Sequence, residues 1–383
     1  MPSPQTTARA FQLARVRRPQ IQAKRCAAAV LAAVSLAASA STGFATEGTG
    51  SRRTLQAACF APAALQAVPG EQIAKKGDRS FAMPLSRSTP LMAAAPVDEP
   101  LRGSIRSVTL PAGRKLIALT FDLCEQSSEI AGYDGRIFDT LRRENVKATL
   151  FAGGKWMRSH EARTQQLMSD PLFEIANHAE AHRNLRTLKA DVLQDEILGP
   201  QRAYELIRKR FSETQCAAPQ IEAMQSLPPR MSLFRFPYGA CNAESMKAVN
   251  DAGLLAIQWD VSIGDPSPGT KPAAMLRALK NVKPGSIIIG HANGRGWHTA
   301  EALPAMITDL KKRGFEFVTV SELLAAGTPV IADTCYNSKP GDTDRYDHFT
   351  GLLASRKQSG GGGWGTLEVK PEQPASRRPA RKS

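Results

Sequence analysis

Short apolar runs alternate with longer amphipathic stretches through the middle of this 383-residue chain. Seven of the apolar runs have the length and composition of buried strands: 116–121, 148–152, 173–176, 233–236, 256–259, 286–290 and 315–320. Helical patterns lie between them, at 135–144, 190–210, 271–281 and 300–313. Strands that alternate with helices form parallel βαβ units, so the pattern predicts an α/β protein with a closed or nearly closed barrel.

Polar residues gather at one end of these predicted strands. Residues able to do chemistry stand at or just past the C-terminal ends of five strands: Asp122, His178, Arg235, Tyr238, Asp260, Asp265 and His291. In α/β barrels the active site forms at the C-terminal rim of the strands. The shared position of these residues therefore predicts an enzyme.

Two of the six histidines, His178 and His182, are four residues apart and follow a predicted buried strand. Residues i and i+4 of a helical turn face the same way, so two imidazoles at this spacing can bind one cation. Two solvated histidines at the start of a helix are the alternative, since the spacing also arises by chance.

The net charge of +15 suggests nucleic-acid binding until its distribution is considered. Residues 1–45 hold six basic and no acidic residues, and residues 356–383 hold seven basic and two acidic residues. The part between them is only mildly basic and has no stripe of Lys and Arg interleaved with aromatic residues. We therefore expect no nucleic-acid partner.

The N-terminus predicts an exported protein. Basic residues precede an apolar run over 26–40, and small residues over 38–45 suit signal-peptide cleavage. An uncleaved anchor is the alternative, but the run is shorter than the about 20 residues that span a bilayer. We expect a periplasmic or secreted protein without a membrane span once the signal is removed.

The composition divides the chain into four parts. We expect a signal peptide at 1–45, a low-complexity linker at 46–103, a catalytic domain at 104–330, and an extension at 331–383. The extension ends in a basic, glycine-rich tail that reads as disordered and suits contact with an anionic wall or membrane surface.

Export permits disulfide bonds. The chain holds six cysteines, and removal of Cys26 with the signal leaves an odd number. At least one of them is therefore unpaired or paired between chains, and spacing does not say which.

Five short motifs follow one another in the predicted domain. They are Thr120-Phe121-Asp122, His178-x-x-x-His182, Arg235-Phe236-Pro237-Tyr238-Gly239, the run from Trp259 to Asp265, and Ile289-Gly290-His291. In this order they resemble the motifs of the NodB-homology polysaccharide deacetylases, carbohydrate esterase family four. The resemblance covers about 115–324 and implies a distorted (β/α)7 barrel. It also implies metal-dependent removal of N-acetyl, or O-acetyl, groups from an amino-sugar polymer.

The resemblance implies a role for each motif residue. A divalent metal, zinc with cobalt or nickel as alternatives, would bind His178 and His182. Asp122 would be the general base, and Arg235 would keep it ionised. His291 would be the general acid.

Supporting roles follow in the same way. Asp265 takes the family's position for the acidic partner of His291, with Asp260 in reserve. The backbone N–H of Tyr238 would stabilise the oxyanion, and Trp259 would line the pocket for the acetyl methyl group.

The first motif departs from the family pattern. Leu123 stands where the family has a second aspartate, the third metal ligand, and leucine cannot bind a cation. Three outcomes are open: Asp122 itself coordinates the metal, Glu125 or Cys124 supplies the ligand, or the metal binds weakly or not at all. We favour an inert buried thiol for Cys124.

The fourth motif also departs, because Pro266 replaces its usual tryptophan. Two alternative functions therefore stay open. One is a non-catalytic glycan-binding relative of the same fold. The other is a hydrolase of small non-sugar amides, which a closed pocket would favour over an open groove.

Overall fold

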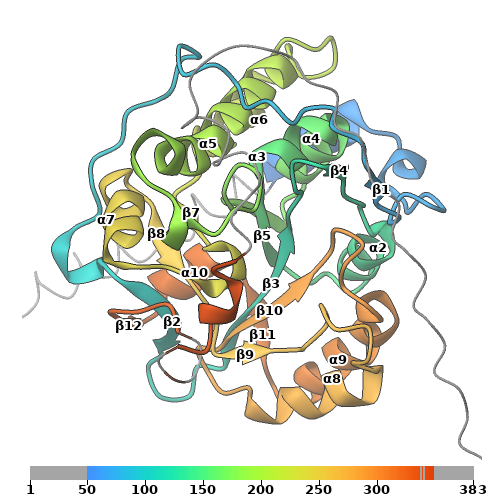
Figure 1. The fold of residues 1–383 in the computed structure, drawn as a ribbon. Helices are drawn as coiled ribbons and strands as arrows, with labels where there is room; N and C mark the ends of the chain where they lie inside the picture. Colours follow the sequence, from blue (N-terminus) through green and yellow to red (C-terminus); the bar gives the residue numbers. More distant parts are fainter. Residues whose placement is uncertain (1–49, 337–338, 340, 349–383) are drawn as a thin grey trace, which may run out of the picture.

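The computed structural model describes residues 50–336, 339 and 341–348 (Figure 1). The predicted signal peptide and the basic tail lie outside these residues. Within them, no helix combines the length and the apolar character needed to cross a membrane.

A ten-stranded curled sheet forms the centre of the fold. Its strands are β2 (Ser104–Thr109), β3 (Leu116–Leu123), β5 (Ala148–Ala152), β6 (Phe173–Asn177), β7 (Leu233–Phe234), β8 (Leu255–Ile257), β9 (Val261–Ser262), β10 (Ile287–His291), β11 (Glu316–Val318) and β12 (Thr328–Ala332). They are ordered β12-β2-β8-β7-β6-β5-β3-β10-β9, and β11 also pairs with β3. All of these pairs are parallel except β12 with β2. The seven predicted strands are present, and the α/β fold class is confirmed.

Helices surround the sheet (Figure 1). Four of them correspond to the predicted helical patterns: α2 (Gly135–Arg143), α5 (Ala190–Ser212), α8 (Pro272–Ala278) and α9 (Thr299–Lys312). The others are α3 (Gly154–Ser159), α4 (Glu161–Ser169), α6 (Ile221–Gln225), α7 (Ala243–Asp251) and α10 (Val320–Ala325). These helices cover the outer face of strands whose residues are apolar on both faces, as buried parallel strands require.

Residues 50–103 are packed against the domain, which corrects their prediction as a linker. Residues 50–59 are helical, and Leu55 is fully buried in the core. A disulfide joins Cys59 to Cys216, and β1 (Lys75–Lys76) pairs with β4 (Glu129–Ile130). The alanine- and proline-rich sequence has no periodicity because its order comes from these distant partners.

The side chains of β3 alternate between two environments, because successive strand residues face opposite sides of a sheet. Ile117, Leu119, Phe121 and Leu123 belong to the large core beneath the helices. Thr120 and Asp122 lie on the other face, inside the curled sheet. Leu123 is fully buried, so the residue that follows Asp122 points away from the interior of the barrel.

This alternation predicts that Leu123→Asp destabilises the fold. Leu123→Ala should lower the free energy of unfolding by about 2–5 kcal/mol, because it leaves a cavity in the core. Leu123→Asp should lower it further, since it also buries an unpaired carboxylate. Urea denaturation of both variants and the native protein measures the difference. A Leu123→Asp variant as stable as Leu123→Ala would contradict this orientation.

Candidate active site

The parallel strands bring the predicted site residues to one rim. Asp122 in β3 and His291 at the end of β10 are direct partners in the register of the two strands. His178 directly follows β6, and Arg235 directly follows β7. Arg235 N donates to the carbonyl of Asn177 at 2.9 Å, which continues the pairing of β6 with β7 beyond the assigned strands.

A buried ion pair holds Asp122. The Nη1 group of Arg235 donates to Asp122 Oδ1 and to Thr120 Oγ1, both at 2.8 Å, and Arg235 has no exposed surface. Its guanidinium also lies 3.9 Å from the centre of the Phe151 ring. Burial alone would raise the pKa of Asp122, but His178 and Arg235 outweigh it and the pKa is lowered. Asp122 is therefore a carboxylate that can accept a proton.

The two histidines converge, although they lie in a turn and not on the predicted helical turn. His182 and the intervening Ala179 both have positive φ angles, 52° and 62°. The ring centres of His178 and His182 are 5.1 Å apart. His178 Nδ1 donates to the carbonyl of Arg235 at 2.9 Å, which leaves the lone pair of Nε2 available.

Each imidazole offers a nitrogen that has no hydrogen-bond partner among the described residues, and burial favours the neutral form of both rings. Burial lowers the pKa of His178 and of His182. His178 Nε2 and His182 Nδ1 are buried and have no hydrogen-bond partner among the described residues. Neutral imidazole nitrogens of this kind are ligands for a divalent cation, so these residues fit the predicted metal.

His291 is paired with Asp265. The Nδ1 atom of His291 lies 2.9 Å from Asp265 Oδ1, and the backbone N–H of His291 donates to Asp265 Oδ2 at 2.7 Å. Thr299 Oγ1 also donates to Asp265 Oδ2, at 2.8 Å. Burial lowers the pKa of His291, but Asp265 more than compensates, so the net shift is upward.

The reserve partner, Asp260, is not brought to His291. Its carboxylate accepts hydrogen bonds from Ser286 Oγ and from the backbone N–H of Ile287, both at 2.9 Å. It therefore ties the loop after β8 to the start of β10. This corrects the assignment of Asp260 as a catalytic residue.

Glu125 is not available as a metal ligand, which corrects the prediction that it might supply the third one. It forms a fully buried ion pair with Lys155. Its Oε2 atom also accepts from the backbone N–H of Ala131 at 2.9 Å and from Ser159 Oγ at 2.8 Å. Glu125 thus neutralises Lys155 inside the domain.

Cys124 lies beside the two histidines. Among the described residues, one metal-binding group comes together, made of Cys124, His178 and His182, with their ligand atoms within 4.8 Å of one another. Asp122 is not part of it, although its Oδ2 atom is 3.3 Å from His178 Nε2. Burial raises the pKa of the Cys124 thiol to about 12.

These residues open onto a cavity of about 1060 Å³. Asp122, His182, His291, Tyr238 and Trp259 all line it. The Tyr238 ring lies 4.5 Å from that of His182, and Tyr238 has a left-handed φ of 60°. A non-glycine residue is held in this conformation only by its surroundings, which is frequent at functional sites.

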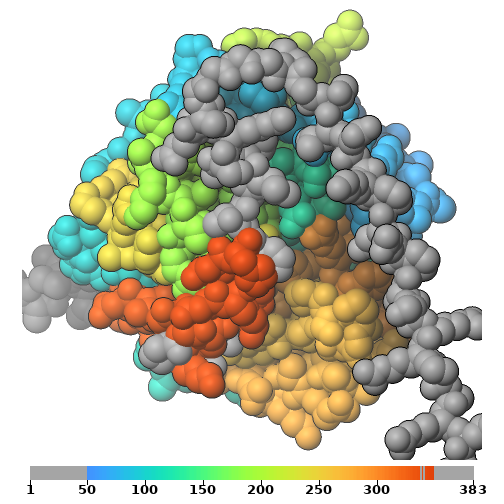
Figure 2. Space-filling view, viewed as in Figure 1, coloured from blue at the N-terminus to red at the C-terminus, as the bar shows by residue number. Residues whose placement is uncertain are grey.

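Two walls of the cavity come from outside the predicted catalytic domain. One is formed by Gln72, Ile73, Ala74 and Lys76, and the other by Asp342, Thr343, Arg345 and Tyr346. Figure 2 shows the last described residues, in orange-red, lying on the face of the molecule. The sequence held no local signal for either wall, because both are positioned by contacts with distant residues.

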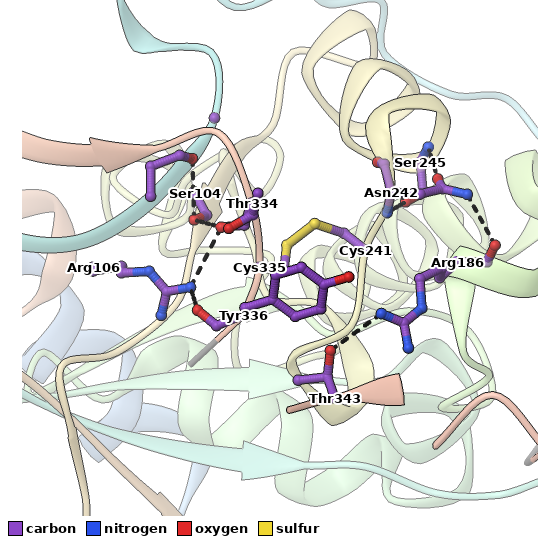
Figure 3. The surroundings of a disulfide bond; sticks show 12 residues. Ser104, Arg106, Arg186, Cys241, Asn242, Ser245, Thr334, Cys335, Tyr336 and Thr343 are labelled. Carbon is purple, nitrogen blue, oxygen red and sulfur yellow. Dashed lines mark hydrogen bonds between the residues drawn. A yellow bond between two sulfur atoms is a disulfide. The ribbon is translucent and has the colours of Figure 1, made fainter. Parts of the chain in front are cut away.

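The C-terminal wall is held in place at several points. The ring of Tyr346 stacks on Tyr238 with centres 5.2 Å apart, and Arg186 forms ion pairs with Asp344 and Asp347 at 2.8 and 2.6 Å. A disulfide between Cys241 and Cys335 attaches the preceding segment to the domain (Figure 3). The wall is thus a fixed part of the cavity.

Comparison with known proteins finds similarity over part of the chain that includes Asp122, His178, His182 and Arg235. Residues 109–257 match the family model described as polysaccharide deacetylase. This part of the chain is similar to the polysaccharide deacetylases. The resemblance inferred from the five motifs is confirmed.

Polysaccharide deacetylases of known name are similar to the chain over its middle part. A peptidoglycan-N-acetylglucosamine deacetylase of Bacillus cereus is 29% identical over 219 residues, 56% of this chain and 91% of that protein. The peptidoglycan-N-acetylglucosamine deacetylase PgdA of Listeria monocytogenes is 29% identical over 225 residues, 58% of this chain but only 42% of that protein. The solved structure of a Bacillus anthracis CE4 family pseudoenzyme is 24% identical, with a TM-score of 0.46, and covers 58% of this chain and 69% of that one.

The pairing of His291 with Asp265 predicts how the stability of the fold depends on pH. Because the pKa of His291 is raised in the folded protein, its pairing with Asp265 stabilises the fold fully below about pH 6.5, the pKa of an unfolded-chain histidine. This stabilisation is lost as the pH rises through the raised pKa. Asp265→Asn should therefore lower the His291 pKa by at least about 1, measured by NMR titration.

Asp260→Asn is the matched control for this titration. It makes the same chemical change on a neighbouring loop, but Asp260 contacts Ser286 and Ile287 and not His291. The His291 pKa should stay at its native value in this variant. An equal shift in both variants would mean that Asp265 does not set the charge of His291.

Proposed function

We propose that this protein is an exported, metal-dependent hydrolase that removes N-acetyl groups from an amino-sugar polymer. The reaction breaks a carbon–nitrogen bond that is not a peptide bond. The observation that carries the proposal is the convergence of Asp122, His182 and His291 on one cavity, with His178 beside His182 and Asp265 paired to His291.

The two imidazole nitrogens fit a divalent cation, with zinc first and cobalt or nickel as alternatives. A cation held there would polarise the acetyl carbonyl and acidify a water molecule. Calcium and magnesium prefer oxygen ligands, so they suit these histidines poorly.

Asp122 and His291 carry the proton transfers. Asp122 is ionised and oriented by Arg235, so it is the group that takes the proton of the attacking water. His291 has its Nδ1 atom committed to Asp265, so its Nε2 atom donates the proton to the departing amine. The raised pKa of His291 keeps that proton in place near neutral pH.

Tyr238 and Trp259 complete the reaction cavity. We assign the backbone N–H of Tyr238 to the oxyanion, since the residue lines the cavity in a fixed left-handed conformation. The ring of Trp259 lines the same cavity and is assigned to the acetyl methyl group.

A saccharide is the favoured substrate class. Both named relatives act on peptidoglycan, and the cavity of about 1060 Å³ is at the upper end of the roughly 300–1000 Å³ of small-molecule sites. The two walls narrow the cavity on two sides, which keeps hydrolysis of a small amide as the second candidate.

Acetate release from N-acetylglucosamine oligomers and from peptidoglycan tests the proposal. The native protein should release acetate, and a chelator should abolish the release. Asp122→Asn should reduce the rate by about 10²–10⁴-fold with the metal content unchanged, because the base is lost while both histidines remain. His178→Ala should lose both metal and activity.

His298→Ala is the control for His178→Ala. His298 lies at the start of α9, where it contacts Lys271 and Glu301, so its removal should leave rate and metal content unchanged. Glycan binding without acetate release from any glycan would favour the non-catalytic alternative. Release of acetate or ammonia only from small amides would favour the second candidate.

A further inference from the structure

We infer that Cys124 is the third metal ligand, so that the cation is bound by one thiolate and two imidazoles. The inference rests on the proposed metal-dependent function and adds the ligand that Leu123 cannot supply. It places the ligand one residue further along the chain than Leu123.

The geometry of β3 explains this shift. Residues at i and i+2 of an extended segment face the same side, so Cys124 follows Asp122 on the inner face while Leu123 enters the core. The pairing of Leu123 with Ala152 keeps the chain extended up to Cys124. A ligand directly after Asp122 on this strand would point away from the histidines.

The Cys124 sulfur lies where a third ligand is needed. The ligand atoms of Cys124, His178 and His182 are already within 4.8 Å of one another. Zinc bonds of about 2.0–2.1 Å to nitrogen and 2.3 Å to sulfur put tetrahedral ligand atoms about 3.5 Å apart. Small side-chain rotations are enough to close that difference.

The site has unsatisfied groups that a cation would satisfy. His178 is 1% exposed, and neither its Nε2 atom nor His182 Nδ1 has a hydrogen-bond partner among the described residues. A buried polar atom without a partner destabilises the folded state, because it has lost its hydrogen bonds to water. A metal bound between these nitrogens and the sulfur removes that destabilisation.

Asn293 is placed to support a thiolate. It is fully buried, and its Nδ2 group donates to the Cys124 carbonyl at 2.7 Å and lies 3.1 Å from Cys124 Sγ. Hydrogen bonds to a ligating atom fix its orientation and tune its affinity for the metal. An inert thiol in an apolar core would not need an amide directed at its sulfur.

The other candidate ligands are committed elsewhere. Glu125 is bound to Lys155, and Asp122, whose Oδ1 atom is bound to Arg235, lies outside the group of three ligand atoms. A thiolate carries the same single negative charge as a carboxylate, so the charge of the site is kept and Asp122 remains free to act as the base. Sulfur also makes the site softer, which favours zinc and cobalt over magnesium and calcium.

Cobalt substitution of the full-length protein tests the ligand directly. The native protein should bind one equivalent of Co²⁺ with an intense sulfur-to-cobalt charge-transfer band in the near ultraviolet. X-ray absorption of the zinc form should find one sulfur at about 2.3 Å. Cys124→Ser should remove both signals and weaken metal binding at least about tenfold. Cys26→Ser, which changes a thiol in the predicted signal peptide, should change neither.

The outcomes separate this inference from the proposed function. One equivalent of metal without a charge-transfer band or a sulfur neighbour overturns the assignment of Cys124 and leaves the deacetylase proposal standing. No metal in the native protein overturns both. If Cys124→Ser does not fold, the spectra of the native protein and of Cys26→Ser still decide the question.

Discussion

The fully buried guanidinium of Arg235 is the contact on which the site depends. It joins Asp122 and Thr120 of β3 to the carbonyls of Ile257 and Gln258 at the end of β8. The backbone carbonyl of Arg235 accepts a hydrogen bond from His178 and so orients its ring. Loss of one partner from such a buried pair costs about 3–5 kcal/mol, because the remaining charge is uncompensated. Arg235 therefore positions Asp122, His178 and the ends of three strands together.

The acidic residues near the rim differ in their partners, and this difference determines what each can do. Asp122 faces an arginine and stays ionised, whereas Asp265 faces His291 and keeps that imidazole protonated. Glu125 is bound to Lys155, and Asp260 to a hydroxyl and a backbone N–H. Of the four carboxylates, Asp122 is thus the proposed base and Asp265 the proposed positioning residue, while Glu125 and Asp260 have structural partners.

Much of the fold could be predicted, because buried parallel strands are continuous apolar runs. The strands that were not predicted are short or lie at the sheet edge, such as β9 and β12, and β2 mixes polar with apolar residues. Residues 50–103 were misjudged because a single buried leucine, a disulfide and a short strand pair hold them. Long-range contacts of this kind leave no periodic trace in a sequence.

Site residues that belong to a local motif could be predicted from the sequence. Residues whose partners depend on the course of the chain could not. Asp260 and Asp265 are five residues apart, and only the course of the loop between them shows which one reaches His291. The role of Leu123 likewise depends on the direction of its side chain, which the order of residues in the motif does not give.

The region that matches the family model ends at residue 257, before Asp265 and His291 and well inside the two outer walls. A version of the chain trimmed to that region would keep Asp122 and the histidine pair but lose His291, the proposed general acid. Trimming to residues 104–330 would restore the acid yet remove both walls and half of each disulfide. The smallest unit that keeps the whole cavity is therefore the described chain, and recombinant production of it requires an oxidising compartment.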